Sequence, residues 1–337
     1  TVKEAMLYEV EEDGRVHCFL CSHHCRIKEG KYGFCGVRRN VDGRLYTLSY
    51  GQIITANVDP IEKKPLYHFF PGTKAFSIAT MGCNFHCDFC QNWQISQTSH
   101  RDGTAGERQN VEPLEIARSA VERGCRSIAY TYTEPTIFFE YAYDTARLAR
   151  EQGLANVFVT NGYMTPEALE AAVPYLDACN VDLKSFQDAF YKERCKGRLQ
   201  PVLDAIRKMR ELGIWVEVTT LVIPGQNDGE DELAGIAGFI AGTDPDIPWH
   251  ISRFHPDYQL TEAESTPVST LERARDLGRE AGLRYIYVGN VAGASADTHC
   301  PHCNAPVVKR RTFSVSEQTV KNGLCPNCGK PVAGVFE

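Results

Sequence analysis

Helix-like and strand-like segments alternate along the chain from about residue 112 to residue 288. The helical segments are amphipathic and carry boundary residues such as Pro113 near a start and Gly124 or Gly213 at an end. The strand-like segments are short and apolar. The predicted helices cover residues 111–124, 136–153, 166–173, 200–213, 228–242 and 267–282, and the predicted strands cover residues 125–131, 155–160, 175–183, 214–222, 248–254 and 283–288. This alternation predicts an α/β fold with a parallel sheet and right-handed crossovers.

Another strand-like segment, residues 74–81, precedes this region and is bounded by Pro71, Gly72 and Gly82. With it, six βα units and a seventh short strand can be counted. That count fits either a partial barrel or an open sheet. Residues 94–109 are polar and lack a hydrophobic period, so they predict a loop near the functional site that could act as a lid.

Three cysteines, Cys83, Cys87 and Cys90, follow the first strand with the spacing C-x3-C-x2-C. Thiolates favour zinc, copper(I) or iron–sulfur clusters. Structural sites usually have four protein ligands, so three ligands in one loop predict a 4Fe-4S cluster with one iron open to a substrate. The alternative is a zinc knuckle that lacks one partner. The loop leaves the carboxyl end of a strand, where α/β folds build active sites, and Phe89 could cover the cluster or stack on a ligand.

This spacing, at the end of a strand, resembles that of the radical S-adenosylmethionine (SAM) superfamily. Residues 59–72 and the triplet Gln91, Asn92 and Trp93 extend the likeness. They resemble the radical SAM member of the AmmeMemoRadiSam system, which is similar to pyruvate formate-lyase activating enzymes. The resemblance covers about residues 18–287 and implies a partial (βα)6 barrel.

The resemblance also implies a reaction. An open iron would bind SAM, and one electron would cleave SAM to methionine and a 5'-deoxyadenosyl radical that takes hydrogen from a substrate. A one-electron donor of the flavodoxin or ferredoxin type would be needed. The substrate, a small molecule or a protein, is not named by the sequence. Cys83, Cys87 and Cys90 would form the catalytic centre.

Glu134 follows the predicted strand 125–131, where radical SAM enzymes carry a Gly-Gly-Glu motif that binds the amino group of SAM. Tyr132 and Thr133 replace the two glycines, so only Glu134 and Pro135 fit that motif. The resemblance makes Glu134 a SAM ligand. The alternative is an acidic residue beside an N1 proline, where it stabilises the helix dipole.

Other polar residues follow later strands. Thr160 and Asn161 match a Thr-Asn-Gly segment near the SAM carboxylate and ribose in the activating enzymes, although the segment is also a plausible turn. Asp182 and Lys184 alternate onto one face of their strand. The resemblance implies that they hold SAM or the substrate, and the alternative is an ordinary ion pair. His255 matches a histidine that contacts SAM in the activating enzymes.

Two further cysteine groups flank the barrel region. The C-terminal group forms two C-P-x-C knuckles, which predict a zinc-ribbon or rubredoxin-like centre with zinc preferred over iron. Its members are Cys300, Cys303, Cys325 and Cys328. The N-terminal group predicts either structural zinc, which we favour slightly, or an auxiliary 4Fe-4S cluster, with unligated thiols as the alternative. Its members are Cys18, Cys21, Cys25 and Cys35.

We therefore predict an N-terminal cysteine-rich module over residues 1–70, a radical SAM barrel over 71–290 and a zinc-ribbon or rubredoxin-like module over 291–337. Three of the fourteen cysteines lie outside the groups. Cys125 and Cys179 are predicted core residues, and Cys195 has no predicted role. The grouping favours metal ligands in a cytoplasmic enzyme over disulfides.

Composition excludes some classes of protein. A hydrophobic content of 43% and a charged content of 23% are typical of soluble globular chains. No segment has the pattern of a signal peptide or the roughly 18 apolar residues of a membrane span. A net charge of −7 does not favour nucleic-acid binding.

The main prediction is thus a radical SAM enzyme that makes a substrate radical. One alternative is an activase that places a glycyl radical on a partner enzyme. Another, of a different class, is a non-catalytic iron–sulfur and zinc protein that carries electrons or scaffolds partners.

Overall fold

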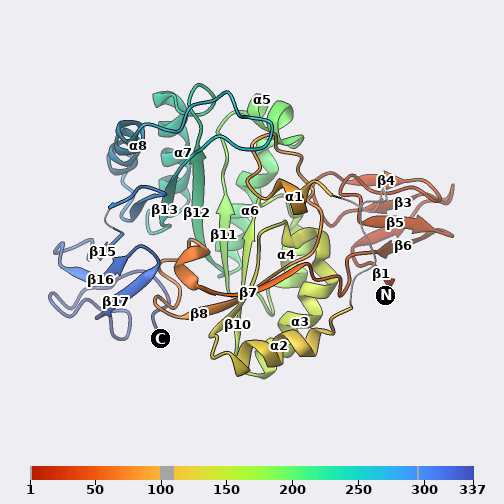
Figure 1. Ribbon diagram of the computed structural model, residues 1–337, viewed down its shortest axis with the longest axis horizontal. Helices are drawn as coiled ribbons and strands as arrows, with labels where there is room; N and C mark the ends of the chain where they lie inside the picture. The colour runs from red at the N-terminus through yellow and green to blue at the C-terminus, as the bar shows by residue number, and fades with distance from the viewer. Residues whose placement is uncertain (1, 99–109, 294–295) are drawn as a thin grey trace.

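The computed structural model in Figure 1 describes residues 2–98, 110–293 and 296–337. Its main feature is an eight-stranded sheet with the order β14-β13-β12-β11-β10-β9-β8-β7. Neighbouring strands are parallel except β7 and β8, which are antiparallel. The strands are β7 (Thr55–Pro60), β8 (Lys74–Ala79), β9 (Ser127–Tyr130), β10 (Ala155–Thr160), β11 (Ala178–Asp182), β12 (Trp215–Val222), β13 (Trp249–Arg253) and β14 (Ile286–Gly289). Because β7 and β14 are both edges, the sheet is an open, partial barrel and the predicted α/β fold class is confirmed.

Helices connect the parallel strands of this sheet. They are α2 (Pro113–Glu122), α3 (Phe139–Glu151), α4 (Pro166–Ala172), α6 (Leu199–Glu211), α7 (Glu230–Thr243) and α8 (Val268–Glu280). Shorter segments are η1 (Ile61–Lys63), α1 (Trp93–Ser96), η3 (Pro135–Phe138), α5 (Asp188–Phe190) and η4 (Tyr191–Cys195), the last a π-helical turn. Within the described ranges, no helix is long and apolar enough to cross a membrane.

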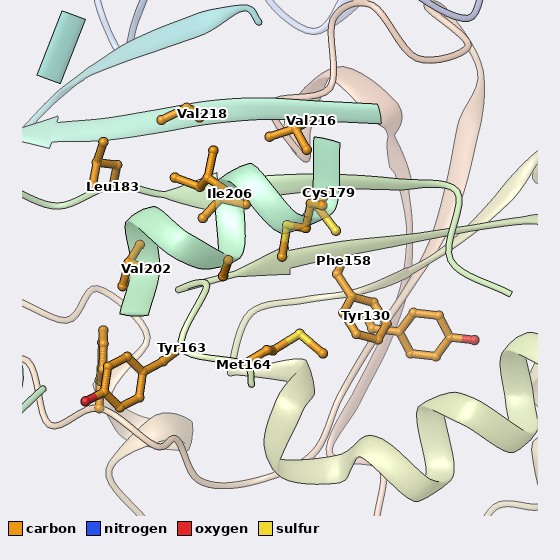
Figure 2. Packing of buried hydrophobic residues seen from close by; sticks show 14 of the residues in the cluster. Tyr130, Phe158, Tyr163, Met164, Cys179, Leu183, Val202, Ile206, Val216 and Val218 are labelled. Carbon is orange, nitrogen blue, oxygen red and sulfur yellow. The ribbon is translucent and has the colours of Figure 1, made fainter. Parts of the chain in front are cut away.

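The core lies between the helices and the outer face of the sheet. Helix α6 illustrates it, since its apolar side chains recur at helical spacing and are buried. Figure 2 shows Ile206 of α6 among Cys179, Val216 and Val218 of β11 and β12. Cys125 and Cys179 are buried, as predicted, and Cys195 is buried as well.

Three small antiparallel sheets flank the barrel, two from the N-terminal part and one from the C-terminal part of the chain. Figure 1 shows these parts at opposite ends of the molecule. The N-terminal sheets are β2 (Tyr8–Val10), β3 (Val16–Cys18) and β4 (Cys25–Ile27), and β1 (Lys3–Glu4), β6 (Arg44–Thr47) and β5 (Arg38–Val41). The C-terminal sheet is β15 (Thr298–His299), β16 (Pro306–Arg311) and β17 (Ser314–Gln318).

The predicted segments agree with the observed ones in type and order, and their ends differ by a few residues. Strand β7 was not predicted. It is an edge strand with mostly exposed side chains, so it lacks an apolar pattern. The predicted loop 94–109 contains the end of α1, and its residues 99–109 lie outside the described residues. The boundaries of the three predicted modules stay a prediction.

A buried polar network closes the amino end of the barrel. Glu217 of β12 lies 2.6 Å from His250 Nε2 and accepts the backbone N–H of His68 at 2.8 Å. The imidazole of His68 lies 2.6 Å from the Tyr287 hydroxyl and 2.7 Å from the Ala333 carbonyl oxygen. Two backbone hydrogen bonds of 2.7 Å also join the segment 68–70 to Val335. The C-terminal segment therefore forms part of the barrel floor.

The stability of this floor should depend on pH. Burial disfavours the imidazolium and lowers the pKa of His68 to about 4. In the unfolded chain histidine titrates near pH 6.5, so below that pH the unfolded state binds a proton that the folded state does not. We expect the free energy of unfolding to fall by roughly 3 kcal/mol between about pH 6.5 and pH 4 because of this one group.

Urea unfolding at a series of pH values measures this effect. His68→Gln should flatten the decline, whereas His302→Gln, at an exposed position, should leave it unchanged. An equally steep decline in His68→Gln would contradict the assignment to His68.

Candidate functional site

The C-x3-C-x2-C loop leaves the carboxyl end of β8, as predicted. Gly82 begins it with a φ of +98°, a left-handed conformation that favours glycine. A Cβ at this position would lie 3.2 Å from Val37 Cγ1 and 3.5 Å from the Cys35 carbonyl oxygen. Glycine therefore lets the loop pass close to the N-terminal sheets.

The three thiols of the loop are buried or half-buried. Burial raises the pKa of Cys83 and of Cys90, so the thiolate forms need the positive charge of a metal. The sulfur of Cys83 accepts the N–H of Phe85 at 3.3 Å, and that of Cys90 lies 3.1 Å from Ser96 Oγ. Of the described residues, only the C-terminal cysteines form a group of three or more spaced to hold a single ion. Cys83, Cys87 and Cys90 do not form such a group.

Glu134 is a buried carboxylate at the end of β9. It caps η3 by accepting the backbone N–H of Thr136 at 3.1 Å. It also accepts the Thr160 hydroxyl at 2.7 Å and the backbone N–H of Asn161 at 2.8 Å. These donors are neutral, and among the described residues no cationic side chain forms an ion pair with Glu134. The geometry thus supports the capping role, and burial raises the pKa of this carboxyl.

Asn161 joins the end of β10 to the cysteine loop. Its side-chain amide donates to Asn84 Oδ1 at 2.7 Å and lies 3.9 Å from the sulfur of Cys83. Through Asn161, the predicted residues Thr160 and Glu134 lie next to the loop.

Asp182 is the last residue of β11, and Lys184 follows close to it. Lys184 Nζ is 2.9 Å from Asp182 Oδ2, and the ammonium lies 5.9 Å from the centre of the Phe89 ring. Phe89 is buried and packs against Phe190, with ring centres 5.6 Å apart. In this structure Phe89 therefore anchors the loop in the core, while part of Asp182 remains exposed.

His255 lies on the loop after β13, and its side chain is exposed. Gln91, directly after the third cysteine, places its amide nitrogen 3.2 Å from His255 Nδ1. A stacked pair of Trp93 and Tyr258, with ring centres 5.1 Å apart, makes a second contact between the same loops. The loop that follows β13, the sixth parallel strand, therefore contacts the cysteine loop from the opposite side of the barrel mouth.

Several contacts of the loop were not predicted. The buried thiol of Cys195 interacts with that of Cys87, and the Cys195 carbonyl oxygen accepts the N–H of His86 at 3.0 Å. Arg194 forms an ion pair with Asp88 at 2.7 Å. The only signal for Cys195 in the sequence was an isolated cysteine in a polar stretch, which is weak evidence. These contacts show that the turn η4 holds the cysteine loop in place.

The four C-terminal cysteines come together as predicted. Their sulfur atoms all lie within 4.8 Å of one another. Cys300 and Cys328 are 3.7 Å apart, and Cys303 and Cys325 are also 3.7 Å apart. The two knuckles therefore bring four sulfur atoms to the spacing of a site for one metal ion.

Comparisons with known proteins agree with this geometry. A family model described as the radical SAM superfamily matches residues 77–236. An uncharacterized protein of Methanocaldococcus jannaschii is 46% identical over 335 residues, which cover 98% of this chain and 99% of that protein. A second protein of that organism, named as a candidate glycyl-radical enzyme activating enzyme, is 27% identical over 231 residues, covering 66% of this chain and 89% of its own length.

Among solved structures, a radical SAM methyltransferase from Sphaerobacter thermophilus has the same fold. The TM-score is 0.50 with 18% identity, over 65% of this chain and 67% of that protein. The matched family segment contains β9 to β12 and the whole cysteine loop. These matches, with the partial barrel and the thiol loop at its mouth, show that the chain belongs to the radical SAM superfamily.

Proposed function

We propose that this enzyme binds a 4Fe-4S cluster through Cys83, Cys87 and Cys90 and binds SAM at the iron that these cysteines leave open. When bound, the two cofactors supply reductive cleavage of SAM to a 5'-deoxyadenosyl radical, which takes hydrogen from a substrate. One observation carries the proposal. The cysteine loop at the end of β8 contacts the side chain of Asn161, whose backbone N–H donates to the buried carboxylate of Glu134.

The residues around the loop have separate roles in this proposal. The Glu134 carboxylate would accept the ammonium group of SAM, because its present partners are all neutral donors. It also fixes Thr160 and Asn161, which would contact the carboxylate or ribose of SAM. His255 would contact SAM from the opposite loop, through its position beside Gln91.

Asp182 and Lys184 would orient SAM or the substrate, since both lie at the mouth beside the loop and their charges balance each other. Phe89 supports the loop from the core and shields it from water. A low-potential one-electron donor of the flavodoxin or ferredoxin type would supply the electron. We further propose a cytoplasmic enzyme, because reduced thiols in groups suit that compartment.

The test is anaerobic reconstitution with iron and sulfide, reduction with dithionite, and detection of 5'-deoxyadenosine from SAM. Wild-type protein should form it, and Cys87→Ala should form none above background. Cys125→Ala is the matched control, since Cys125 lies outside all three cysteine groups. No product from the wild type, or full activity in Cys87→Ala, would contradict the proposal.

A glycyl-radical activase is the second candidate, because the 27%-identical relative is named as such an activating enzyme. The substrate would then be a backbone glycine of a partner protein. Incubation with a partner, SAM and reductant should give the electron paramagnetic resonance (EPR) signal of a glycyl radical on that partner. A radical EPR signal that forms with a small molecule and without any partner protein would favour the first candidate. Membership of an enzyme superfamily disfavours the non-catalytic alternative.

For the C-terminal site we propose zinc. Zinc–sulfur bonds of about 2.3 Å in a tetrahedron place the sulfurs about 3.8 Å apart. The observed separations of 3.7 Å match that value.

Replacing Cys325 with alanine should therefore remove about one zinc per chain, because three cysteines leave the tetrahedron open. Elemental analysis measures this. The melting temperature should also fall, since binding of a structural metal contributes to folding. Cys125→Ala should keep its zinc, and an unchanged zinc content in Cys325→Ala would contradict the assignment.

A further inference from the structure

The N-terminal cysteines gather around the hairpin formed by β3 and β4. Cys18 and Cys25 are direct partners across the two strands. Cys21 lies in the turn between them, and Cys35 follows shortly before β5. The Cys21 thiol is close enough to the other three to interact with each of them electrostatically. Residues from one short segment thus build a four-thiol site.

Each of the four sulfur atoms accepts an N–H donor. The Arg38 guanidinium donates to Cys18 at 3.1 Å, and the backbone N–H of Phe34 donates to Cys25 at 3.4 Å. The backbone N–H groups of His23 and Val37 donate to Cys21 and Cys35. Hydrogen bonds to the sulfurs are typical of thiolate-bound iron–sulfur clusters, so this geometry fits a metal centre.

The distances between sulfur atoms distinguish a site for one metal ion from a site for an iron–sulfur cluster. The C-terminal cysteines have the separations of a single tetrahedral ion, 3.7 Å. Among the residues that the structure describes, no second group of three or more ligands meets the spacing for one ion. Neither the four N-terminal thiols nor Cys83, Cys87 and Cys90 form such a group. In an iron–sulfur cluster each thiolate binds a different iron, so its ligands stand further apart than the ligands of one zinc ion.

The four-thiol site lies directly against the loop of the radical centre. His23 Nε2 is 2.7 Å from the carbonyl oxygen of Asn84, and the rings of Phe34 and His86 are 4.7 Å apart. The carbonyl oxygen of Cys35 lies next to Gly82, the residue before Cys83. The segment that holds the N-terminal cysteines therefore packs directly against the loop that holds Cys83, Cys87 and Cys90.

We infer that Cys18, Cys21, Cys25 and Cys35 bind a second 4Fe-4S cluster that adjoins the first one. This replaces the preference for zinc that the cysteine spacing alone suggested. The second cluster would take one electron from the reduced donor and pass it to the first. The donor is oxidised by one electron, the second cluster returns to its starting state, and no bond is made or broken. The N–H donors at the sulfurs favour the reduced cluster, which carries one more negative charge.

The decisive experiment removes the first cluster. The variant Cys83→Ala/Cys87→Ala/Cys90→Ala, reconstituted anaerobically with iron and sulfide, should retain about four iron and four sulfide per chain and the EPR signal of a reduced cluster. This readout does not depend on SAM cleavage, so the inference stands if the proposed reaction fails. A variant that holds no iron, with or without a second zinc, overturns the inference.

Wild-type protein provides a second measurement that needs no variant to fold. It should bind about eight iron per chain, and its reduced EPR spectrum should be broadened by coupling between two nearby spins. Cys21→Ala/Cys35→Ala should lose half of the iron and give a sharper signal that still responds to SAM, whereas Cys125→Ala should match the wild type. About four iron in the wild type, or an unchanged count in Cys21→Ala/Cys35→Ala, overturns the inference.

Discussion

Replacing Glu134 with glutamine should weaken SAM binding by roughly 10- to 100-fold, because a hydrogen bond to a charged group contributes about 1.5–3 kcal/mol. The buried carboxylate supplies the only negative charge that we assign to the ammonium group of SAM. Glutamine keeps the size of the side chain and one acceptor oxygen. Its amide nitrogen, however, would face a donor such as the N–H of Asn161, which now lies 2.8 Å from the carboxylate.

Titration of the reduced cluster's EPR signal with SAM measures this affinity directly. Iron content should stay at the wild-type level, since Glu134 is not a cysteine ligand. Glu115→Gln is the control, because Glu115 lies in the first turn of α2 on the exposed surface. If Glu134→Gln binds SAM as tightly as the wild type, the role of Glu134 is limited to capping η3.

Replacing Glu140 with leucine should lower the free energy of unfolding by about 3–5 kcal/mol, because it leaves a buried guanidinium without its partner. The ion pair of Arg38 and Glu140 is almost fully buried, with 2% and 0% of the side chains exposed. Arg38 belongs to β5 and Glu140 to α3, so the pair joins the N-terminal sheet to the barrel. Glu140 also accepts the backbone N–H of Met6 at 2.7 Å.

Urea unfolding under anaerobic conditions measures the loss. The double variant Arg38→Met/Glu140→Leu should recover much of the stability, since two apolar side chains need no partner. Glu230→Gln, which breaks an exposed pair with Arg273, should change the free energy of unfolding by less than about 1 kcal/mol. A Glu140→Leu protein as stable as the wild type would mean that water already reaches the guanidinium.

The parallel part of the fold was predictable because its strands are buried on both faces. Such strands appear in the sequence as continuous apolar runs, and the predicted strand at 155–160 coincides with β10. Strand β7 has no such run, since only Asp59 among its residues is buried. Its position depends on pairing with β8, which is a tertiary contact.

The candidate site, like the fold, has a part that the sequence predicts and a part that it does not. The cysteine spacing marked the loop, and the strand ends marked Glu134 and Asn161. The contacts that hold the loop in place come from distant parts of the chain, as with Cys195 below Cys87 and His23 beside Asn84. No local pattern predicts such pairs, because they depend on how the turn η4 and the N-terminal hairpin fold back onto the barrel.

The contact between the barrel floor and the C-terminal segment has a consequence for synthesis of the protein. His68 bonds to Ala333, which is 265 residues later in the chain. At a translation rate of about 5–20 residues per second, the ribosome needs roughly 15–50 s to add those residues. During that interval the amino end of the nascent barrel is not covered by the C-terminal segment. Phe69, which is buried in the folded protein, is then without its neighbour Val335. A chaperone that binds apolar segments would therefore find its best target on the ribosome, before residues 333–335 emerge.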